Sequence, residues 1–113
     1  ILNECLEAAE ELEKKNISTE VVNMHTIKPL DENKILSILE NSKLLVSVEE
    51  HNIIGGLGTA MAELISSSKQ KKPLLRLGVN DKYSKSGSYN YLKNFYGLST
   101  NKIIDNILKF LND

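Results

Sequence analysis

The apolar positions of the chain follow two alternating periods. Apolar residues at helical spacing, with Lys and Glu between them, mark four segments: 2–16, 31–41, 57–65 and 99–111. Extended or nearly continuous apolar runs mark three others: 20–25, 44–48 and 74–79. Helices and strands that alternate with short connections predict an α/β domain with a largely parallel sheet.

Residues with strong backbone preferences mark where the predicted elements begin and end. Pro29 fixes its own φ angle after the strand over 20–25, and Asp31 is placed to cap the helix that follows. A short helix is predicted over 89–96, with Gly97 ending it and Ser99 capping the last helix. The last helix is expected to bury Ile103, Ile104, Ile107, Leu108 and Leu111.

The first predicted element is a helix with no strand before it. The sheet of a βαβ domain usually opens with a strand. We therefore expect residues 1–113 to be one domain of a larger chain, with the first strand missing.

Charge and composition argue against several classes of function. The formal net charge of −1 gives no basic field for nucleic acid or an acidic membrane. No apolar run in the sequence approaches the ~20 residues of a membrane helix. The single cysteine, Cys5, lies on the apolar stripe of the first helix and is expected to be a buried small hydrophobe. A lone cysteine fits a reducing compartment, so we expect a cytoplasmic protein.

The segment from Val48 to Gly58 is the first candidate for chemistry, because it joins the clearest strand to a helix start. Ligands of open α/β sheets tend to bind at this edge, and free amides at a helix start attract anions. The Gly-Gly-x-Gly pattern of Gly55, Gly56 and Gly58 matches neither the dinucleotide pattern nor the P-loop. Close strand–helix or interdomain packing is therefore favoured over phosphate binding.

Glu49, Glu50 and His51 offer a second possibility, an acid/base set, since His titrates near neutrality. Adjacent residues of an extended segment point to opposite faces, so Glu50 and His51 would not both face one substrate. A polar segment held by hydrogen bonds is the favoured interpretation. Two histidines and one cysteine without short ligand spacing predict no metal site.

Three stretches taken together resemble one known family. They are Thr26 to Asp31 (TIKPLD), Val48 to Ala60 (VEEHNIIGGLGTA) and Arg76 to Asp81 (RLGVND). Their order and spacing, with the closing Tyr-Gly-Leu-Ser of residues 96–99, resemble the C-terminal domain of transketolase-like enzymes over nearly the whole chain. In that family a strand precedes the first helix found here.

The resemblance implies a three-layer α/β/α domain with a mostly parallel sheet. It also implies that thiamine diphosphate and a divalent metal, Mg²⁺, bind between the other two domains across a dimer interface. No catalytic, cofactor-binding or metal-binding residue of this chain is assigned. Glu50, His51, Gly55, Gly56 and Gly58 match the family's motif and are predicted to face the rest of the subunit or a partner subunit. The parent assembly would be homodimeric or heterotetrameric.

Several reactions share such a domain. The Glu-Glu-His run and the Ser86-Gly87 pair look closer to split, small-subunit transketolases than to deoxyxylulose-phosphate synthases. The first hypothesis is therefore the C-terminal part of an enzyme that moves a two-carbon ketol unit between sugar phosphates. The alternatives are the same domain of a deoxyxylulose-phosphate synthase or a 2-oxo-acid dehydrogenase beta subunit, an independent nucleotide- or phosphate-binding module, and a purely structural assembly domain.

Overall fold

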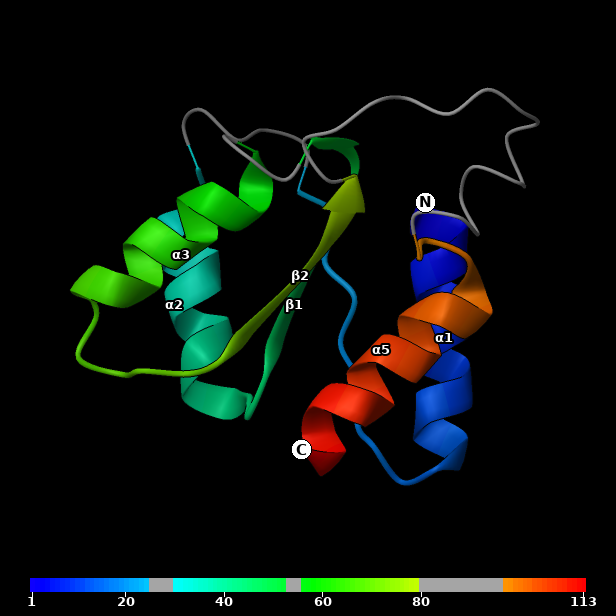
Figure 1. The fold of residues 1–113 in the computed structure, drawn as a ribbon. Coiled ribbons are helices and arrows are strands. Elements are labelled where there is room, and N and C mark those ends of the chain that lie inside the picture. Colours follow the sequence, from blue (N-terminus) through cyan, green and yellow to red (C-terminus); the bar gives the residue numbers. More distant parts are fainter. Residues whose placement is uncertain (25–29, 53–55, 80–96) are drawn as a thin grey trace. The chain divides into compact units, whose positions relative to one another are not determined.

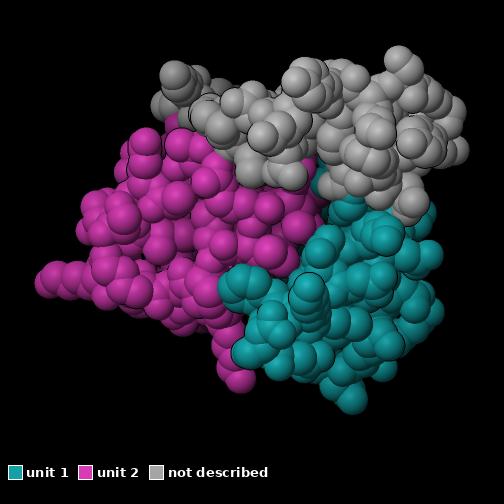
Figure 2. All heavy atoms as spheres, viewed as in Figure 1, with its two compact units in different colours: residues 1–23, 82–113 teal, residues 24–81 magenta. Residues whose placement is uncertain are grey.

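The computed structural model of the protein describes residues 1–24, 30–52, 56–79 and 97–113, with the side chains of 50–52 and 79 left aside. The chain divides into two compact units, residues 24–81 and residues 1–23 with 82–113 (Figure 2). The elements of each unit are labelled in Figure 1. The predicted helix over 89–96 lies outside the described residues.

The unit of residues 24–81 is built on two parallel strands. β1 (Leu45–Asn52) pairs with β2 (Leu74–Val79), with Leu45 opposite Leu74 and Ser47 opposite Arg76. Parallel strands need a crossover, and α3 (Leu57–Ser67) supplies it. This unit confirms the predicted parallel pairing and the predicted segments 44–48, 57–65 and 74–79.

One apolar core holds the helices of this unit to its strands. α2 (Glu32–Asn41) contributes to it from before β1 in the chain, and Figure 1 shows α2 beside α3. The buried members of the core are Ile35, Leu39, Leu45, Met61 and Ile65. Asp31 caps α2 as predicted, because its carboxylate accepts a hydrogen bond from the Lys34 amide at 3.1 Å.

The other unit pairs two amphipathic helices, α1 (Leu2–Lys14) and α5 (Thr100–Asn112), which pack against each other (Figure 1). Their buried side chains are Ala8, Ala9, Leu12, Ile103, Ile104 and Ile107. The Thr100 hydroxyl also donates a hydrogen bond to the Glu7 carboxylate at 2.9 Å. Ser99 caps α5 as predicted by accepting from the Lys102 amide.

The end of α1 has a backbone turn of its own. Asn16 adopts a φ of 64°, in the left-handed region. The Ile17 amide donates to the Leu12 carbonyl and the Asn16 amide to the Glu13 carbonyl, both closing back onto the last turn of the helix. This is the Schellman arrangement, with Asn in the place that glycine usually takes. The helix therefore ends at Lys14, slightly before the predicted end at residue 16.

Two sequence predictions about the elements are wrong. Residues 20–24 form no strand, while His25 lies outside the described residues. Val21 and Val22 are only half-buried, so little apolar burial favours a ladder at this position. Leu111 was expected in the core but is 42% exposed, because it lies in the last turn of α5, beyond the buried residues of that helix.

Candidate functional site

The candidate site lies where β1 leads into α3, and polar side chains from both strands meet the helix there. Leu45, Ser47 and Glu49 alternate along β1 as its buried positions, following the two-residue period of a strand. The helix begins after Gly56, which has no side chain with which to cap it. The first turn of α3 therefore needs hydrogen-bond acceptors from elsewhere in the chain.

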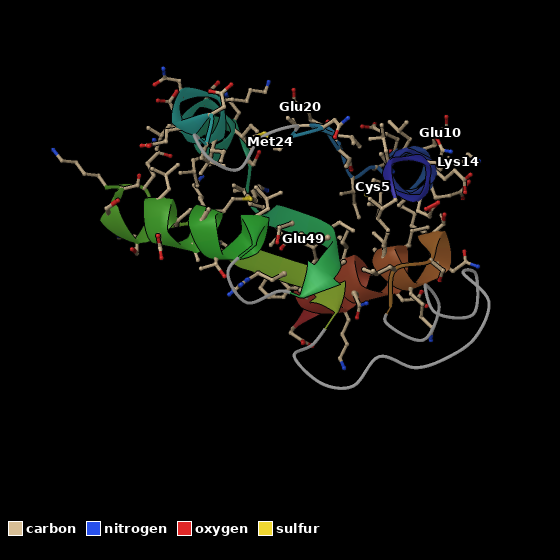
Figure 3. All side chains as sticks on the ribbon, turned by 90° about the horizontal axis from the view of Figure 1, so that it is seen from above. Cys5, Glu10, Lys14, Glu20, Met24 and Glu49 are labelled. Carbon is tan, nitrogen blue, oxygen red and sulfur yellow. The ribbon has the colours of Figure 1, made fainter. Side chains whose placement is uncertain are left out.

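Glu49 supplies those acceptors. One carboxylate oxygen accepts from the Leu57 amide at 2.6 Å, and the other accepts from the Gly58 amide at 3.0 Å. The residue is only 8% exposed, and Figure 3 labels it at the β1 end of this joint. A carboxylate at a helix N-terminus interacts favourably with the helix dipole, and bonds from backbone amides to an ionised group are strong. Glu49 thus acts as an internal cap from the neighbouring strand.

Gly58 lies in very close contact with the two strands. A Cβ built at this position would lie 2.7 Å from Arg76 Nε and 2.8 Å from Ser47 Oγ. Ser47 is 1% exposed, and its hydroxyl has no hydrogen-bond partner among the residues that the structure describes. Any side chain at position 58 would therefore force the Arg76 and Ser47 side chains, or the helix itself, to move.

Arg76 joins the second strand to the same turn of helix. Its Nη2 donates a hydrogen bond to the Thr59 hydroxyl at 2.7 Å. Because Arg76 lies opposite Ser47 in the strand register, β1, β2 and the first turn of α3 meet at one place. We call Ser47, Glu49, Gly58, Thr59 and Arg76 the polar joint.

The residues predicted from the sequence lie around this joint. Gly56 is the N-cap of α3, and Gly58 lies in its first turn. Glu50 and His51 belong to β1, with side chains outside the described set, and Gly55 also lies outside it. The structure therefore brings Gly56 and Gly58 together at the helix start, while the predicted interface role of all five stays a prediction.

Sequence reasoning missed the parts played by Glu49 and Arg76. A signal for Glu49 was present, since it follows Leu45 and Ser47 at a spacing of two and precedes a helix that starts without a capping side chain. No comparable signal identifies Arg76, because its contact with Thr59 depends on the pairing of β1 with β2.

Other candidate chemistry is limited in the part of the chain that the structure describes. That part contains no group of three or more His, Cys, Asp or Glu residues placed to hold a metal ion. None of its helices is long and apolar enough to cross a membrane. Cys5 is half-buried, and this burial raises the pKa of its thiol.

Parallel strands joined through a crossover helix, with a buried polar joint, define a domain of the α/β class. Comparison with known proteins gives the family. The family model described as Transketolase, C-terminal domain matches residues 1–103. The chain belongs to this family, as its sequence predicted.

Individual relatives agree with the assignment. The chain is 46% identical over 107 residues to a transketolase C-terminal section of Methanocaldococcus jannaschii, covering 94% of this chain and 33% of that protein. It is 40% identical over 109 residues to a 1-deoxy-D-xylulose-5-phosphate synthase of Caldanaerobacter subterraneus subsp. tengcongensis, covering 96% of this chain and 18% of that protein.

A solved structure confirms the fold. The split-gene transketolase, solved as an inactive beta4 tetramer, matches with a TM-score of 0.84 and 33% identity, covering 96% of this chain and 34% of that one. The predicted transketolase C-terminal-like α/β fold is thus confirmed. The chain spans about a third or less of the length of these relatives.

Proposed function

We propose that this chain is the C-terminal domain of a transketolase-like enzyme that transfers a two-carbon ketol unit between sugar phosphates in the cytoplasm. The observation that carries the proposal is the 46% identity to a transketolase C-terminal section, which extends over 94% of the chain. The single cysteine is compatible with the reducing compartment in which such an enzyme would work.

Within that enzyme the domain serves assembly and contributes no catalytic residue. The polar joint supports this assignment, because both oxygens of the Glu49 carboxylate accept hydrogen bonds from backbone amides. A carboxylate held in this way stabilises a helix start and is poorly placed to exchange protons with a substrate. The domain would pack on the remaining domains or on a separate subunit, within a homodimer or a heterotetramer.

Enzymes of the transketolase family use thiamine diphosphate, and the polar joint does not fit this cofactor. A diphosphate bound at the start of α3 would need the Leu57 and Gly58 amides, which Glu49 already engages. The described residues likewise bring together no cluster of metal ligands that could accompany a diphosphate. We therefore assign thiamine diphosphate and its Mg²⁺ to the remaining parts of the enzyme and derive no step of the reaction here.

A second reaction is favoured by a specific observation, the 40% identity to a 1-deoxy-D-xylulose-5-phosphate synthase. Substrate pairs distinguish the two reactions in the complete protein with thiamine diphosphate and Mg²⁺. Ketol transfer from xylulose 5-phosphate to ribose 5-phosphate is the expected result. Turnover of pyruvate with glyceraldehyde 3-phosphate instead would move the reaction to deoxyxylulose-phosphate synthesis and keep the family. Activity with neither pair would contradict both assignments.

The alternative hypothesis, an independent phosphate-binding module, predicts a different response to added phosphate. Its ligand would have to displace Glu49 from two amides, against the repulsion between a phosphate and a buried carboxylate. We therefore expect the NMR signals of the Leu57 and Gly58 amides to stay unchanged when inorganic phosphate is titrated to millimolar concentration. Saturable shifts of these two signals would favour the binding module.

A further inference from the structure

We draw no further inference here: the strongest candidate, the exposed apolar stripe that Leu2 and Leu6 form on α1, carries none, because nothing in the part of the chain that the structure describes shows what covers it.

Discussion

Gly58 occupies a site in which a side chain has little space. A methyl group there would lie within 3 Å of both Arg76 Nε and Ser47 Oγ. We expect Gly58→Ala to lower the free energy of unfolding by about 1–3 kcal/mol, because added atoms in a packed site force their neighbours to move. Chemical denaturation measures the change, with Glu63→Ala on the same helix as the control. A Gly58→Ala protein as stable as that control would show that the joint has room to relax.

The backbone conformation of Asn16 predicts how substitutions at this position change stability. Its φ of 64° lies where residues other than glycine and asparagine are strained. Asn16→Ala should therefore lower the free energy of unfolding by about 1 kcal/mol, whereas Asn16→Gly should leave it unchanged or raise it slightly. The pair is compared by denaturant titration. Equal stability of the Ala and Gly variants would contradict the left-handed turn at the end of α1.

The partial burial of Cys5 leads to a prediction of how the reactivity of its thiol depends on pH. Burial raises the pKa of its thiol, because the thiolate is the form that loses hydration. The half-maximal rate of reaction with a disulfide reagent should lie at higher pH in the native protein than in the protein unfolded in urea. The raised pKa also means that this group favours folding below the unfolded pKa and loses that contribution as the pH rises. Identical pH profiles in both states would contradict the burial of Cys5.

At the scale of elements, α2 offers a matched test of the core. Leu39 is 1% exposed and belongs to the core with Ile35 and Leu45, whereas Leu36 on the same helix is 37% exposed. Leu39→Ala should lower the free energy of unfolding by about 2–5 kcal/mol, since it leaves a cavity. Leu36→Ala should cost well under half as much. Similar losses for both would mean that α2 does not bury the face described here.

The sequence predicted those elements whose signals are local. Asp31 and Ser99 cap their helices as their positions indicated, and all but the first residue of the apolar run over 44–48 lies in the parallel strand β1. The predicted strand is not formed over residues 20–24. A short run with few strongly apolar residues does not reveal whether a neighbouring strand is available to pair with it. The polar joint was largely hidden for a related reason. Arg76 takes its role from strand pairing, which brings together residues far apart in the chain.

At the scale of the whole molecule, the family assignment gives the domain its context. The matched relatives are about three to six times longer than the segment they share with this chain. Resemblance of motifs predicted the family correctly from the sequence. It could not predict the reaction, because one C-terminal domain accompanies several chemistries.

We propose that this domain supports assembly of a ketol-transferring enzyme without contributing to its chemistry. The most direct measurement is thiamine-dependent transfer from xylulose 5-phosphate to ribose 5-phosphate, together with sedimentation, by the complete enzyme and by a version lacking residues 1–113. We expect the complete enzyme to be active, and the shortened version to lose both its assembly and its activity. A shortened version that assembles normally yet is inactive would contradict the claim, because the domain would then act in the chemistry itself.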